Sequence, residues 1–121
     1  MGKQYDAGKE IVVVAKSGKE LTLTVRRSDS KFGAMGSAGG VDFQLEQPHT
    51  VRYKRDSNLF NRSITLFVDG KQVFRKDIFN PFERIEFPFE IEGIDCEFVV
   101  YYYAVALEVK VYAGGHEVFY Q

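Results

Sequence analysis

The sequence ITLFVDGKQVF, residues 64–74, decides the fold class of this chain. Apolar side chains stand at every second position from Ile64 to Val68, which is the period of a strand with one buried face. Asp69-Gly70 follows at once, and this pair favours a type I′ turn because both central residues of that turn need a positive φ angle. Apolar residues resume at Val73. The stretch therefore predicts an antiparallel β-hairpin.

The same alternation continues on both sides of this hairpin, for example over residues 20–25, 49–55 and 85–91. Short turns with Gly, Asn-Pro or Gly-Gly separate the strands, and no segment has the i, i+3, i+4, i+7 apolar stripe of a helix. The chain is therefore predicted to be all-β, an antiparallel β-sandwich of about eight to nine strands joined by short hairpins. Pro88 cannot donate a ladder hydrogen bond, which places its strand at a sheet edge or a bulge.

A second hairpin is predicted over residues 107–119, with the sequence LEVKVYAGGHEVF. Like ITLFVDGKQVF, it consists of a strand, a turn containing Gly and a returning strand that ends in Val-Phe. Two interpretations stay open: an internal repeat, or the likeness that any two hairpins share.

The chain of 121 residues fits a single β domain. Within it, residues 1–32 form an N-terminal hairpin, residues 33–40 a glycine-rich linker and residues 41–121 the core β-sandwich. The linker, GAMGSAGG, is either a natural loop or a remnant of the kind that removal of a purification tag leaves behind. In the second case residues 1–32 are an appended or fused segment.

Composition excludes several classes of partner. The net charge is −1, which argues against nucleic acid and gives no electrostatic attraction to an anionic membrane. Cys96 is the single cysteine, so no internal disulfide can form, and a reducing compartment fits best. No apolar run reaches the roughly 18 residues of a spanning helix, and the N-terminus lacks a signal peptide. We expect a cytoplasmic protein.

The residues that carry chemistry are few. His49 and His116 do not stand at metal-ligand spacing, and no phosphate-binding or dinucleotide-binding motif is present. Cys96 lies between Asp95 and Glu97, whose charges disfavour a thiolate, and it is expected to pack in the core. We therefore expect no catalytic, cofactor-binding or metal-binding residues and no enzyme. An enzyme would need His49 or His116 to converge on Cys96 or on a pair of carboxylates.

Aromatic residues offer the candidate binding surface, since the chain has 11 Phe and 7 Tyr but no Trp. Neighbours on a strand point to opposite faces, so the three residues from Tyr101 to Tyr103 cannot all be buried. Candidate partner-binding residues are Tyr101, Tyr103, Phe119 and Tyr120. They indicate a docking surface for a protein partner, with a homodimer through a sheet edge as one form. The alternative is that no such surface is exposed, because the second sheet and residues 1–32 cover both faces of the sheet that contains these tyrosines.

Residues 41–121 contain several short motifs in order: VDFQL at 41–45, PHTV at 48–51, VDGKQVFRK at 68–76 and GIDC at 93–96, with the hairpin at 107–118 closing the series. In order and spacing they resemble the Fas apoptotic inhibitory molecule family. The resemblance implies a compact antiparallel β-sandwich in the cytoplasm, without enzymatic activity or catalytic residues. Members of that family are associated with protection from cell death through contacts with other proteins.

The residues and the family resemblance leave two possible functions for this chain. The first is a non-enzymatic protein–protein interaction module similar to these apoptosis-regulatory domains. The second is a β-barrel or sandwich that binds a small ligand or a carbohydrate, because a barrel of about eight strands can hold one small molecule. A deep apolar pocket would favour the second function.

Overall fold

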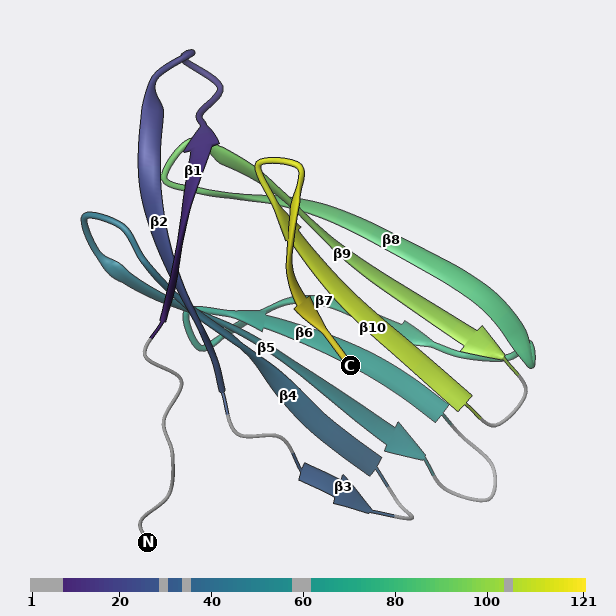
Figure 1. The fold of residues 1–121 in the computed structure, drawn as a ribbon. Coiled ribbons are helices and arrows are strands. Elements are labelled where there is room, and N and C mark those ends of the chain that lie inside the picture. Colours follow the sequence, from purple (N-terminus) through teal and green to yellow (C-terminus); the bar gives the residue numbers. More distant parts are fainter. Residues whose placement is uncertain (1–7, 29–30, 34–35, 58–61, 104–105) are drawn as a thin grey trace, which may run out of the picture.

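The computed structural model describes residues 8–28, 31–33, 36–57, 62–103 and 106–121, with side chains for all of these except 31–33. Two antiparallel sheets face each other (Figure 1), which confirms the predicted all-β sandwich. The larger sheet contains β1 (Lys9–Val14), β2 (Glu20–Arg27), β3 (Lys31–Gly33), β4 (Gly36–Gln44), β5 (Pro48–Ser57), β6 (Arg62–Val68) and β7 (Lys71–Asp77). The smaller contains β8 (Phe82–Ile91), β9 (Ile94–Tyr103), β10 (Ala106–Ala113) and β11 (His116–Tyr120).

Strand order follows chain order almost throughout. The larger sheet runs β1-β2-β4-β5-β6-β7, with β3 paired to β4, and the smaller runs β11-β10-β9-β8. The described residues thus hold eleven strands, slightly more than the eight to nine expected. No helix that could cross a membrane occurs in the described part of the chain.

The core lies between the two inner sheet faces, where the predicted alternation places its apolar residues. On β9, Phe98 and Val100 are fully buried, and they belong to the same hydrophobic cluster as Ile64 and Leu66 of β6. Each such side chain contributes about 1.5–3 kcal/mol relative to an exposed position. Tyr53 adds aromatic contacts, with its ring centroid 6.4 Å from that of Phe98.

Two turn and edge predictions are confirmed. Asp69 and Gly70 have φ angles of 53° and 80°, as a type I′ turn requires. β8, which contains Pro88, pairs only with β9 and is an edge strand of the smaller sheet. An edge strand tolerates a proline because alternate amides of such a strand point away from the sheet.

The assignment of residues 33–40 as a linker is wrong for residues 36–40. These residues begin β4, which pairs with β5 along its whole length, from Gly36 opposite Asp56 to Gln44 opposite Pro48. A Cβ atom on Gly36 or Gly40 would collide with the β5 backbone, at the carbonyl oxygens of Arg55 and Val51 respectively. The glycines thus allow close approach of two strands. Residues 34–35 lie outside the described residues.

The N-terminal hairpin is built into the larger sheet. β2 pairs with β4 from Thr24 opposite Gln44 onward, and Val13 and Leu23 belong to the buried core. The Lys16 amide also donates a hydrogen bond of 2.9 Å to the Gly93 carbonyl in the smaller sheet's β8–β9 turn. That residues 1–32 are an appended segment stays a prediction, and deletion of the hairpin tests it.

Candidate interaction surface

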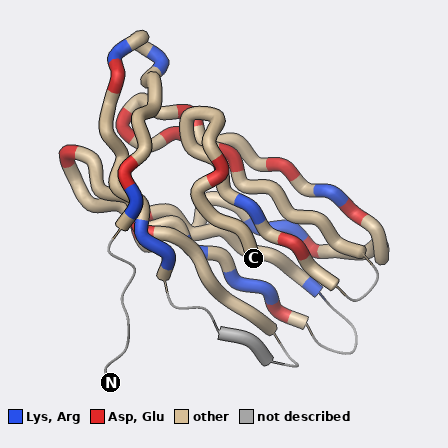
Figure 2. The backbone as a smooth tube through the Cα atoms, viewed as in Figure 1, with Lys and Arg blue, Asp and Glu red and all other residues tan. Residues whose placement is uncertain are grey.

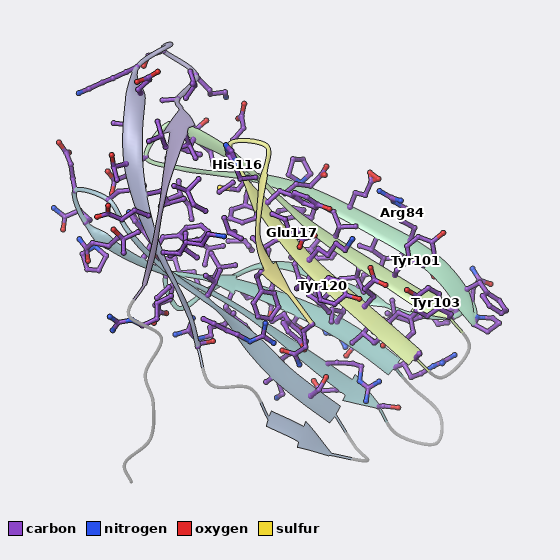
Figure 3. All side chains as sticks on the ribbon, in the orientation of Figure 1. Arg84, Tyr101, Tyr103, His116, Glu117 and Tyr120 are labelled. Atoms are coloured by element: carbon purple, nitrogen blue, oxygen red, sulfur yellow. The ribbon has the colours of Figure 1, made fainter. Side chains whose placement is uncertain are left out.

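Tyrosines gather on the outer face of the smaller sheet (Figure 3). Tyr101 and Tyr103 of β9 are 39% and 37% exposed, whereas Tyr102 between them is buried. This is the alternation expected of a strand whose inner face packs on a second sheet. Tyr120, at the end of β11, is 51% exposed and joins the same outer face, since it pairs with Lys110 of β10.

The two β9 tyrosines form a stacked pair that charged neighbours bracket. Their ring centroids are 5.2 Å apart and the ring planes differ by 30°. The Arg84 guanidinium of β8 lies 5.8 Å from the Tyr101 ring centroid. The Tyr103 hydroxyl donates a hydrogen bond to the Glu108 carboxylate on β10, which raises the pKa of Tyr103 and lowers that of Glu108. These contacts hold both rings in place without burying them.

Lys110 connects the stacked pair to Tyr120. Its ammonium nitrogen lies 5.3 Å from the Tyr120 ring centroid, a cation–π contact. The same nitrogen lies 3.4 Å from a Glu108 carboxylate oxygen and 3.6 Å from one of Glu117. A continuous row of aromatic and charged side chains thus crosses all four strands.

An exposed phenylalanine extends this row at the β8 edge. Phe82 is 69% exposed and pairs with Tyr103, two register positions from the Arg84–Tyr101 pair. Phe82 is not among the residues predicted from the sequence, although two-residue alternation back from Arg84 places it on this face. We call the set of Phe82, Arg84, Tyr101, Tyr103, Glu108, Lys110, Glu117 and Tyr120 the tyrosine face.

Phe119, the remaining candidate residue, is not on the tyrosine face. It is buried, with its ring centroid 6.2 Å from that of Tyr53, and the Arg27 guanidinium lies 4.7 Å from its own centroid. Phe119 precedes the exposed Tyr120 on the same strand and so points to the opposite, inner face. Its assignment to a partner-binding surface is therefore wrong.

Comparison with protein-family models, curated proteins and solved structures finds no match to this chain. The resemblance of residues 41–121 to the Fas apoptotic inhibitory molecule family accordingly stays a prediction from the quoted motifs.

A second polar cluster, which the sequence did not reveal, joins the two sheets at one end. His49 of β5 contacts Asp69 through Nδ1, at 2.9 Å, and Glu92 through Nε2, at 2.6 Å. Asp69 belongs to the β6–β7 turn and Glu92 to the β8–β9 turn, so each sheet supplies one carboxylate. Asp69 and Glu92 lie 20 and 43 residues from His49 along the chain, so no local sequence pattern indicates that the three residues meet. We call these three residues the histidine clamp.

The two carboxylates also bind backbone amides. Asp69 accepts a hydrogen bond from the Thr50 amide at 3.0 Å, and Glu92 accepts one from the Gln47 amide at 3.0 Å. Partial burial by itself would lower the pKa of His49, but the contacts with Asp69 and Glu92 outweigh it and raise that pKa above 6.5. Burial would raise the pKa values of the two acids, yet their contacts with His49 and these amides lower both. The contacts therefore favour the protonated form of His49 and the ionised forms of both carboxylates.

This arrangement brings a histidine together with two carboxylates, which is one of the convergences that an enzyme would need. Both ring nitrogens of His49 contact these carboxylates in the structure. Cys96 is buried on an inner sheet face, where burial and then the Asp95 charge raise its pKa to about 12. His116 is exposed at the start of β11. In the described residues, no group of three or more His, Cys, Asp or Glu could hold a metal ion.

Proposed function

We propose that this protein is a non-enzymatic interaction module that binds a protein partner through the tyrosine face. The observation that carries the proposal is the row of exposed aromatic rings held in place by arginine, lysine and glutamate on the outer surface of one sheet. Tyrosine and arginine are enriched at protein interfaces, where they supply large contact areas with a polar end. Rings that are already ordered lose little conformational entropy on binding.

The arrangement of the rings favours a protein over a carbohydrate. A sugar stacks on a free aromatic face, whereas Tyr101 stacks on Tyr103 and has Arg84 beside its ring. Lys110 occupies one face of the Tyr120 ring in the same way. What these tyrosines offer a partner is therefore ring edges, hydroxyl groups and charges, which suits the mixed chemistry of a protein surface.

The packing between the sheets supports the same preference over a small-ligand barrel. Phe98 and Phe43 are among the largest fully buried side chains, and they fill inner positions on both sheets. The resemblance to the Fas apoptotic inhibitory molecule family adds a cytoplasmic role in the regulation of cell death to this proposal.

The test compares proteins captured by the wild-type chain and by the double variant Tyr101→Ala/Tyr103→Ala, using isotope-labelled quantitative mass spectrometry. We expect a specific partner to be lost with the double variant, because both rings of the stacked pair are removed. The matched control is Val12→Thr/Val14→Thr on β1, which alters two exposed apolar side chains, each 57% exposed, away from the tyrosine face. Equal recovery of every protein by wild type and both variants would reject the proposal.

A further inference from the structure

Basic residues lie toward the end of β5 and at the start of β6, which are paired neighbours in the larger sheet (Figure 2). Arg55 follows the buried Val51 and Tyr53 on the inward side of β5. Arg62 opens β6 on the same side as the buried Ile64. Both arginines are half-buried, so solvent reaches them. Tyr102 of β9 approaches from the opposite sheet, with the Arg62 guanidinium 5.7 Å from its ring centroid.

Among the described residues at this end, two buried polar atoms have no hydrogen-bond partner. They are the Tyr102 hydroxyl oxygen and the Arg55 Nε, both buried. The Tyr53 hydroxyl differs, because it hydrogen-bonds the Ser37 side chain. Burial raises the pKa of Tyr102, and the nearby charges of Arg55 and Arg62 act against that rise. An unsatisfied buried donor costs about 1–3 kcal/mol, so a pair of them calls for an acceptor.

The described residues supply no such acceptor to Arg55. None of their carboxylates lies within ion-pair distance of the Arg55 guanidinium, and the neighbouring Asp56 instead lies 3.7 Å from Lys54. Glu83 pairs with Tyr102 across the β8–β9 ladder, but its carboxylate lies 3.2 Å from the Lys76 ammonium. The Glu83 carboxylate is thus neutralised by Lys76, and within the described part of the chain the charge of Arg55 has no carboxylate at ion-pair distance.

We propose that this end of the sandwich is an oxyanion-binding site that accepts a carboxylate or phosphate group. Arg55 Nε and the Tyr102 hydroxyl donate hydrogen bonds to the anion, and Arg62 adds a second positive charge. A guanidinium suits this role because its planar donors match carboxylate and phosphate oxygens. The site lies between the sheets, whereas the tyrosine face lies on the outer surface, so either proposal can fail without the other.

The test is thermal unfolding of the full chain in chloride, inorganic phosphate or acetate, at constant ionic strength and pH. We expect phosphate, acetate or both to raise Tm saturably relative to chloride, because a ligand that binds only the folded state stabilises it. A response to one anion alone assigns the site to a tetrahedral or a planar group.

Two variants locate the effect. Tyr102→Phe keeps the buried ring and removes only the partnerless hydroxyl, so Tm in chloride should stay the same or rise. Its apparent affinity for the anion should fall about tenfold, as expected for one lost hydrogen bond to a charged group. Arg55→Met should abolish the saturable response. Arg75→Met is the control, since Arg75 lies on β7 and pairs with Asp77 at 3.0 Å.

Absence of any saturable response in the wild type would overturn the proposal and leave water as the acceptor at Tyr102. A response that Tyr102→Phe and Arg55→Met both retain at wild-type strength would also overturn it, because it would show an adventitious ion only. Amide chemical shifts of the variants, recorded by NMR, verify that each is folded.

Discussion

Gly114 shows how a single residue couples the two sheets. It has a φ angle of +56°, and a Cβ atom placed on it would lie 2.8 Å from the Cβ of Val13 on β1. The β10–β11 turn of the smaller sheet thus comes into close contact with the first strand of the larger sheet. A side chain at this position would meet both an unfavourable backbone conformation and a packed neighbour.

Gly114→Ala should therefore lower the free energy of unfolding by about 2–4 kcal/mol, the sum of backbone strain and overpacking. Gly115→Ala is the matched control: its φ angle is +82°, but no atom lies within 4 Å of the added Cβ. Gly115→Ala should lower the free energy of unfolding only by the backbone strain of a positive φ angle, about 1 kcal/mol. Urea denaturation measures both values, and equal losses would show that the Val13 contact imposes no restraint.

For single residues, two-residue alternation in the sequence predicted which sheet face several side chains occupy. It placed Tyr101 and Tyr103 on the face opposite to Tyr102, and it placed Cys96 in the core, as the structure has them. It failed for Phe119, which is the strand neighbour of the exposed Tyr120 and therefore points to the opposite face. It missed the histidine clamp because Asp69 and Glu92 reach His49 only through the folded arrangement of two turns.

At the scale of elements, the hairpins were predictable and their irregularities were not. The hairpins β6–β7 and β10–β11, similar in sequence, each contain a register shift, between Leu66 and Phe67 in the first and between Val111 and Tyr112 in the second. Each shift begins three residues before its two-residue turn. The shared bulge extends the likeness of the two sequences to their backbones.

The glycine-rich segment shows why composition misled. Four glycines in eight residues usually indicate a flexible chain, since glycine loses the most entropy on ordering. Here the space beside β5 admits no Cβ at Gly36 or Gly40, so the same residues are needed for strand pairing. The need for glycine comes from the position of the β5 backbone, so the local sequence of residues 33–40 does not reveal it.

Deletion of residues 1–28, which removes β1 and β2, should destabilise the remainder severely. The deletion removes Val13, Leu23 and Val25 from the core and uncovers one edge of β4. Loss of a single buried Leu side chain already costs about 2–5 kcal/mol, and three buried residues exceed that. Chemical denaturation measures the loss in free energy of unfolding. The single substitution Leu23→Ala removes one of the same core side chains and should cause a smaller loss. A remainder that unfolds at the same denaturant concentration as the full chain would make the hairpin an appended segment.

Across the whole molecule, the histidine clamp makes the joining of the sheets dependent on pH. The pKa of His49 is raised, so its contribution is complete below the unfolded value of 6.5 and is lost as pH rises through the higher folded value. The pKa values of Asp69 and Glu92 are lowered, so their contributions are complete above their ordinary values of 3.8 and 4.5 and are lost on acidification. Stabilisation by the clamp is therefore largest between pH 4.5 and 6.5.

His49→Gln should lower the free energy of unfolding by about 1–2 kcal/mol within that window, allowing for the partial exposure of Asp69. The difference from wild type should shrink as pH rises above the window or falls below it. His116→Gln, at the chain's other histidine, is the control and should change stability little at any pH. Unfolding of all three proteins across a pH series measures this, and a His49→Gln effect that is constant with pH would contradict the assigned charges.

The stacking of Tyr101 on Tyr103 also gives this protein a built-in optical probe. Because the chain has no Trp, its near-ultraviolet circular dichroism and intrinsic fluorescence arise mainly from tyrosine. Two phenol rings held 5.2 Å apart at a fixed tilt are close enough for their electronic transitions to couple, and such a chiral pair has its own dichroic band. A molecule that docks on this face and separates or reorients the rings would change that band without any added label. Binding to the outer surface could thus be followed spectroscopically in the unmodified protein.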